Sequence, residues 1–185
     1  MVTVSSEPLM KLNLNMLGDD TVGKTTLVRK MDNKQYSKSH IRTTGLDSIR
    51  FEYTAKDGVK LNCRLVDTAG QERFRTLTYS YYRNADAVIL AFNLTSRESF
   101  NSCTTWLQSL KKHGAEQLPK MLVGNKVDLL EESNDCVNDI EAQKLANENN
   151  MIYMKTCALT GLNVEEMFHN AIEQAYEYKK ESLKL

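Results

Sequence analysis

The 185-residue sequence has no long run of apolar residues, and it contains only 2 Pro and 8 Gly. None of its apolar stretches reaches the roughly 18 residues that a membrane-spanning helix needs. The N-terminus also lacks the charged segment and longer apolar run of a secretory signal peptide. With 41% hydrophobic residues, the composition excludes a disordered or collagen-like chain. We therefore expect a single globular domain in the cytoplasm.

The sequence also lacks an excess of either charge, because 24 basic residues balance 24 acidic ones. A formal net charge of zero argues against a protein that binds nucleic acid by neutralising its phosphates. The four cysteines show no C-x-x-C spacing and have no nearby pair of histidines, so no zinc site is expected. A core of this size needs no disulfide bonds, and we predict reduced thiols.

The sequence does contain short apolar runs that alternate with longer amphipathic ones. The apolar runs predict strands at 12–17, 46–55, 59–66, 87–92, 121–123 and 151–154. The amphipathic runs predict helices at 24–30, 100–110, 140–149 and 164–175. Asp57-Gly58 predicts a hairpin between the second and third strands. The alternation of these strands and helices along the chain predicts an α/β fold of the P-loop NTPase type. This fold is a doubly wound, mostly parallel six-stranded sheet with one antiparallel edge strand, flanked by helices.

A phosphate-binding motif follows the first predicted strand. The segment Gly18-Asp19-Asp20-Thr21-Val22-Gly23-Lys24-Thr25 has the spacing G-x-x-x-x-G-K-[ST] between a strand and a helix. Glycines let the backbone wrap a phosphate, and the amide groups of the helix N-terminus supply positive potential. Lys24 is expected to reach the β- and γ-phosphates, and the Thr25 hydroxyl to bind Mg²⁺. This motif leaves the identity of the nucleotide open.

A second motif, Asn125-Lys126-Val127-Asp128, follows another apolar run and reads the base. The Asp128 carboxylate can accept two hydrogen bonds side by side, and guanine offers an N–H and an amine in that geometry. Adenine presents an acceptor there instead, so we predict guanine specificity. Asn125 is expected to tie this loop to the phosphate loop, and the Lys126 stem to pack over the base. Thr156-Cys157-Ala158 is placed to offer the Ala158 N–H to the guanine O6.

With these motifs, the sequence from about Leu12 to Tyr178 resembles the Ras-superfamily small GTPases, and the Rab family most closely. The segment Asp67-Thr68-Ala69-Gly70-Gln71-Glu72-Arg73-Phe74-Arg75-Thr76 is similar to the second switch of Rab proteins. Tyr81-Tyr82-Arg83 and Ser99-Phe100-Asn101 are Rab-like as well. The resemblance implies a switch that binds GTP or GDP with Mg²⁺ and hydrolyses GTP in vesicle trafficking or signalling. It also implies that exchange factors, GTPase-activating proteins and effectors bind through two switch loops.

The resemblance further implies the roles of individual residues. Gln71 orients the attacking water and acts in catalysis with Lys24, while Thr43 and Asp67 join Thr25 as Mg²⁺ ligands. In the GTP form Thr43 and Gly70 hold the two switch loops, and hydrolysis releases them. The expected nucleotide-binding residues are Asp20, Thr21, Val22, Gly23, Lys24, Thr25, Thr26, Tyr36, Thr43, Gly70, Asn125, Lys126, Asp128, Cys157, Ala158 and Leu159.

Several positions depart from the Rab pattern. Asp20 places a carboxylate beside the γ-phosphate, so we expect slow intrinsic hydrolysis and poor stimulation by an activator's arginine. Ser48 and Val66 replace two aromatic residues of the usual effector surface, so we do not expect binding to standard Rab effectors. Leu159 replaces a lysine near the base, and Cys157 replaces a serine. Because a thiol is a weaker hydrogen-bond partner, we expect a lower affinity for guanine.

We expect residues 1–8 to be a flexible extension, 9–181 the GTPase domain, and 182–185 a short tail without a lipidation motif. Because no prenylation or myristoylation signal is present, contact with the cytosolic face of vesicle membranes is expected only through a lipidated tail outside this chain. Two functions stay open. One is a GTP-hydrolysing switch, favoured by Gln71. The other is a nucleotide-locked interaction module with vestigial hydrolysis, alone or as a domain of a longer protein, favoured by Asp20.

Overall fold

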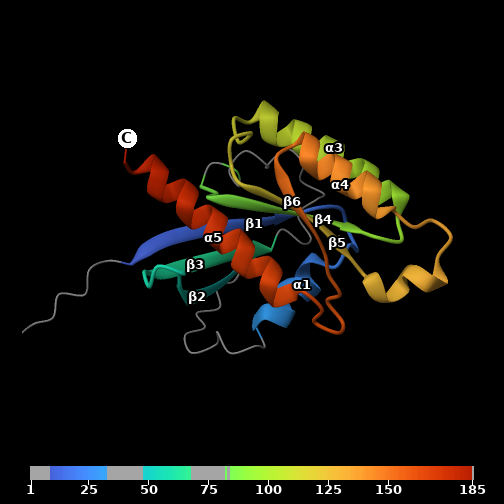
Figure 1. The fold of residues 1–185 in the computed structure, drawn as a ribbon, viewed down its shortest axis with the longest axis horizontal. Coiled ribbons are helices and arrows are strands. Elements are labelled where there is room, and N and C mark those ends of the chain that lie inside the picture. Colours follow the sequence, from blue (N-terminus) through green and yellow to red (C-terminus); the bar gives the residue numbers. More distant parts are fainter. Residues whose placement is uncertain (1–8, 33–47, 68–81, 83, 185) are drawn as a thin grey trace, which may run out of the picture.

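A computed structural model describes residues 9–32, 48–67, 82 and 84–184 (Figure 1). Its strands are β1 (Met10–Leu17), β2 (Ser48–Thr54), β3 (Lys60–Asp67), β4 (Ala87–Asn93), β5 (Lys120–Asn125) and β6 (Met151–Lys155). Its helices are α1 (Lys24–Asp32), α3 (Arg97–Lys112), α4 (Asp139–Glu148) and α5 (Val164–Ser182), with a 3-10 helix, η3 (Val127–Glu132). The predicted strands and helices are all found, most of them within a few residues of their expected ends, but α5 continues seven residues beyond the predicted range 164–175. Among the elements in the described part of the chain, η3 was not expected.

The strands form one six-stranded sheet in the order β2-β3-β1-β4-β5-β6. Neighbouring strands are parallel, except that β2 runs antiparallel to β3 at the edge of the sheet. The predicted turn joins β2 to β3: the Ala55 N–H donates to the Val59 carbonyl at 2.9 Å, and Gly58 has φ +88°. The prediction of a mostly parallel sheet with one antiparallel edge strand is therefore confirmed.

Helices cover the two faces of the sheet, with one hydrophobic core under each layer (Figure 1). One core joins the sheet to α1 and α5 and includes Leu27 and Phe168. The other joins the sheet to α3 and α4 and includes Cys103 and Ala142. Strand β4 contributes to both cores, which explains why its sequence is apolar without alternation.

Strand β1 lies at the point where the strand order reverses, with β3 on one side and β4 on the other. Doubly wound sheets bind their ligands beside such a reversal, at the carboxyl ends of the strands. The phosphate motif follows β1, Asp67 ends β3, Asn125 ends β5, and Thr156 follows β6. The topology therefore brings four segments that lie far apart in the sequence to one edge of the sheet.

Candidate functional site

The loop between β1 and α1 depends on two glycines at which a larger residue would not fit. Gly18 has φ +135°, and a Cβ at this position would lie 2.1 Å from the Ala91 carbonyl oxygen of β4. Gly23 has φ +99°, and a Cβ there would lie 2.4 Å from Asn125 Nδ2. The phosphate loop is thus packed by its backbone against β4 and against the end of β5.

Lys24, the first residue of α1, closes this loop. Its ammonium group donates to the carbonyl oxygens of Gly18 and Asp19, both at 2.7 Å, and the residue is only 3% exposed. Helix α1 has no acidic residue in its first turn, whereas α3, α4 and α5 each have at least one. The positive end of the α1 dipole and a buried ammonium group therefore lie together, which favours an anion.

The Asn125 side chain connects three segments. Its Nδ2 donates to the Val22 carbonyl of the phosphate loop at 2.9 Å. Its Oδ1 accepts from Thr156 Oγ1 at 3.2 Å and from the Ala158 N–H at 3.1 Å. The residue is 1% exposed, so these bonds are shielded from water. In this structure the Ala158 N–H is thus bonded to Asn125, and a guanine O6 would have to share it or take it over.

The Asp128 carboxylate is held by Cys157. The thiol donates to Asp128 Oδ1 at 2.9 Å, and the Thr160 N–H donates to the Cys157 sulfur at 3.4 Å. Cys157 is buried, whereas Leu159 next to it is 74% exposed. The sulfur therefore fixes one carboxylate oxygen, and Leu159 leaves an apolar side chain at the surface beside the expected base position.

Two residues of this region adopt left-handed backbone although they are not glycine: Thr21, with φ 64°, and Lys126, with φ 69°. Such conformations cost on the order of 1–3 kcal/mol, and they are rarest for β-branched residues such as Thr. Lys126 lies at the N-terminus of η3. Its conformation turns the chain out of β5, so that Asp128 lies in the first turn of η3.

Two oxygen-bearing side chains fit a magnesium ion. Asp67 ends β3 and is 1% exposed, and Thr25 is the half-buried second residue of α1. A carboxylate and a hydroxyl belong to the hard oxygen ligands that Mg²⁺ prefers. The other predicted residues Tyr36, Thr43, Gly70 and Gln71 lie outside the described residues. Asp20 within the phosphate loop and Thr26 directly after the motif are both exposed.

The structure adds contacts that the sequence did not predict. Trp106 of α3 donates its Nε1–H to Asp19 Oδ1 at 2.9 Å, across 87 positions. Lys30 of α1 donates to the Leu159 carbonyl at 2.9 Å, across 129 positions. Motifs describe neighbours along the chain, so no local signal could have found either pair.

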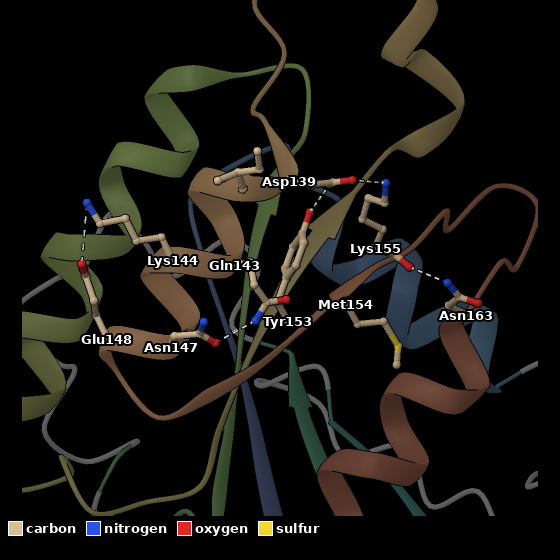
Figure 2. Close-up of a pocket in the computed structure, with 10 residues that line it drawn as sticks. Asp139, Gln143, Lys144, Asn147, Glu148, Tyr153, Met154, Lys155 and Asn163 are labelled. Carbon is tan, nitrogen blue, oxygen red and sulfur yellow. Dashed lines mark hydrogen bonds and ion pairs between the residues drawn. The ribbon is translucent and has the colours of Figure 1, made fainter.

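A separate groove of about 920 Å³ lies between α4, β6 and the start of α5 (Figure 2). Its polar side chains bond to one another: Asp139 accepts from Lys155 at 2.6 Å and from Tyr153 at 3.1 Å, and Gln143 donates to Asn147 at 2.9 Å. None of the predicted nucleotide-binding residues lines this groove. We therefore do not assign the nucleotide to it.

Comparison with known proteins agrees with the geometry at the carboxyl edge of the sheet. Residues 13–177 match the family model described as Ras family. The chain is 38% identical over 157 residues to Ras-related protein RAB1BV of Beta vulgaris, an alignment that covers 85% of this chain and 72% of that protein. It is 37% identical, with the same coverage, to Ras-related protein RABE1d of Arabidopsis thaliana.

The chain belongs to the Ras family. It is a Rab-like small GTPase, a molecular switch that hydrolyses GTP. Members of the family bind GTP or GDP together with Mg²⁺. Among the helices described for this Rab-like GTPase, none is both long enough and apolar enough to cross a membrane.

Proposed function

We propose that this Rab-like GTPase binds guanine nucleotides at the junction of the phosphate loop and the Asn125–Asp128 loop, and that it acts in vesicle trafficking or signalling. The Asn125 side chain carries the proposal, because it bonds to Val22 on one side and to Thr156 and Ala158 on the other. One buried amide thus fixes the separation between the phosphate-binding and base-reading segments. A ligand with a purine at one end and phosphates at the other matches that arrangement.

In the proposed mechanism, the phosphate side of the site is electrostatic. Lys24 and the N-terminal amide groups of α1 neutralise the phosphate oxygens. Thr25 and Asp67, together with Thr43, would hold Mg²⁺, which supplies further positive charge to the phosphates when it is bound. Gln71 orients the attacking water. The exposed Asp20 carboxylate adds negative charge beside the phosphate loop, and we infer slow hydrolysis from it.

The base side of the site selects guanine. Asp128 accepts two hydrogen bonds from the base, and the Cys157 thiol holds its carboxylate in place at 2.9 Å. Lys126 packs its stem over the ring, and Leu159 covers it from the loop after β6. An adenine would set its N1 lone pair against the Asp128 carboxylate, and such a mismatch strongly disfavours binding.

Partners follow from the switch mechanism. Exchange factors, GTPase-activating proteins and effectors would bind through the segments that include Thr43 and Gln71. An alternative, a nucleotide-locked interaction module with vestigial hydrolysis, is favoured by Asp20.

Isothermal titration calorimetry with GDP and ADP tests the nucleotide assignment. We expect GDP to bind at least about a thousandfold more tightly, because ADP sets the lone pair of its N1 against the Asp128 carboxylate, where guanine offers hydrogen-bond donors. Asp128→Asn should reverse the preference from GDP to xanthosine diphosphate, since xanthine carries a carbonyl oxygen where guanine carries its amine. Equal affinity of the unmodified chain for GDP and ADP would contradict the proposal.

A further inference from the structure

Thr21 is a strained residue in the phosphate loop. Three residues of this loop have a positive φ: Gly18 at 135°, Thr21 at 64° and Gly23 at 99°. Glycine adopts such angles at little steric cost, whereas a β-branched side chain in the left-handed region is a genuine outlier. Of these three residues, Thr21 is therefore the one at which the shape of the loop costs conformational energy.

The surroundings of Thr21 do not offset this cost. The residue is exposed, so its side chain gains little from packing. Within the described part of the chain, no hydrogen bond involves Thr21. The loop is held on either side of it, because Asp19 is bonded to Trp106 and the Val22 carbonyl to Asn125. Contacts of the flanking residues thus impose the left-handed conformation on Thr21.

A bound phosphate would supply the stabilisation that the protein itself does not. Left-handed residues in a loop turn successive backbone N–H groups to one side, and the resulting hollow binds an anion. Thr21 directs the amides of the phosphate loop in this way, just before Lys24 and the N-terminus of α1. An anion bonded to these amides favours the strained form. Strain persists only where the surroundings enforce it, so loss of the anion allows Thr21 to return to a negative φ.

We propose that Thr21 weakens the hold of this chain on the phosphates of its nucleotide and so speeds the release of the nucleotide. The inference rests on the proposed function. Binding must restore the strained form of Thr21, and this cost lowers the affinity. The chain therefore exchanges its nucleotide more readily than it would with glycine at position 21. This property favours a switch that cycles over a nucleotide-locked module.

Substitutions at this position separate the branched side chain of Thr21 from its hydroxyl group. Thr21→Gly removes the steric conflict, and Thr21→Asn introduces a residue that tolerates the left-handed region. Both variants should slow the release of a fluorescent GDP analogue by roughly tenfold, a factor that corresponds to about 1.4 kcal/mol. Thr21→Val keeps the branch without the hydroxyl, and it should release the analogue as fast as the unmodified chain.

A comparison of two nucleotides locates the effect at the phosphates. GDP carries the β-phosphate that the phosphate loop is expected to hold, whereas GMP does not. In competition with the fluorescent analogue, Thr21→Gly should bind GDP roughly tenfold more tightly than the unmodified chain does, and GMP equally well. Binding of the analogue to the unmodified chain is measured first. Failure at that step would contradict the proposed function itself, and it is recognised before the variants are compared.

Asn150 provides a control with a similar backbone conformation away from the candidate site. It is exposed, has φ 53° and lies between α4 and β6. Asn150→Thr places a branched residue there, so it should lower the thermal stability of the domain but leave the release of the analogue unchanged. Unchanged release in Thr21→Gly, or an equal gain in affinity for GMP, would overturn the proposal. Slower release in Thr21→Val would overturn it as well, because the effect would then belong to the hydroxyl.

Discussion

At the scale of the residue, Asp19 and Trp106 connect the phosphate loop to α3. The Asp19 carbonyl accepts from the Lys24 ammonium at 2.7 Å, and its carboxylate accepts from the Trp106 indole at 2.9 Å. The Asp19 carboxylate thus adds a negative charge, next to that of Asp20, to the loop that is expected to hold phosphates. One hydrogen bond from Trp106 of α3 fixes the position of this carboxylate. Trp106 is therefore a positioning residue for the phosphate loop.

Trp106→Phe should speed the dissociation of GDP by roughly tenfold, because the released Asp19 carboxylate can turn toward the phosphates and repel them. Asp19→Asn in the same chain should restore slow dissociation, since a neutral amide does not repel phosphate. Stopped-flow release of a fluorescent GDP analogue measures both rates. If the second substitution fails to restore slow dissociation, Trp106 acts only by packing.

Asp20 provides a second prediction at this scale. The exposed carboxylate lies next to the phosphate loop, where the transition state for hydrolysis accumulates negative charge. Asp20→Gly should accelerate single-turnover GTP hydrolysis by about tenfold, which corresponds to roughly 1.4 kcal/mol of barrier. An exposed carboxylate away from the loop provides the control, and Glu116→Gln should leave the rate unchanged. An unchanged rate in Asp20→Gly would show that this carboxylate does not limit hydrolysis.

At the scale of the element, the β2–β3 hairpin is fastened to α5 by side chains from both. The Tyr53 hydroxyl donates to Glu173 Oε1 at 2.8 Å. At the turn, Asp57 accepts from the Tyr176 hydroxyl at 2.9 Å and from Lys180 at 3.1 Å. These bonds tie the end of the hairpin farthest from the candidate site to α5, the longest of the described helices, and they help to fix the position of β2 and β3.

The hairpin contacts predict a pH dependence of stability. Hydrogen bonds from Tyr176 and Lys180 lower the pKa of Asp57 below its usual value. A lowered folded-state pKa stabilises the protein above the unfolded-state pKa, and this contribution is lost as the pH falls through the lower value. Thermal unfolding between pH 2.5 and 7 should therefore show a loss of stability below about pH 4 that Asp57→Asn reduces. Glu52→Gln changes a carboxylate on the face of β2 opposite Tyr53, and this variant should show the same loss of stability at low pH as the unmodified chain.

At the scale of the whole molecule, the candidate site joins segments from four strands. The side chain of Asn125, at the end of β5, bonds to the loops after β1 and β6, so the order of this edge depends on contacts between distant parts of the chain. A ligand that bridges the same segments must add to the stability of the whole domain, because the unfolded chain cannot bind it.

Thermal unfolding with ligands tests this expectation. GDP with Mg²⁺ at about a thousand times its Kd should stabilise the domain by about 4 kcal/mol, and ADP should have no measurable effect. Removal of Mg²⁺ with EDTA should abolish a large part of the stabilisation by GDP, because Thr25 and Asp67 then lose the metal ion that both would bind. Equal stabilisation by ADP would contradict the role assigned to Asp128.

The sequence by itself determined the strands, the helices and the motifs at their ends, because hydrophobic periodicity and loop chemistry are local properties. Local spacing also placed Lys24 at the start of α1 and predicted the turn at Asp57-Gly58. Only the tertiary structure decided that Trp106 holds Asp19 and that Cys157 holds Asp128. Each of these pairs is set by how strands and helices pack, and packing brings together residues whose separation in the chain carries no signal of contact.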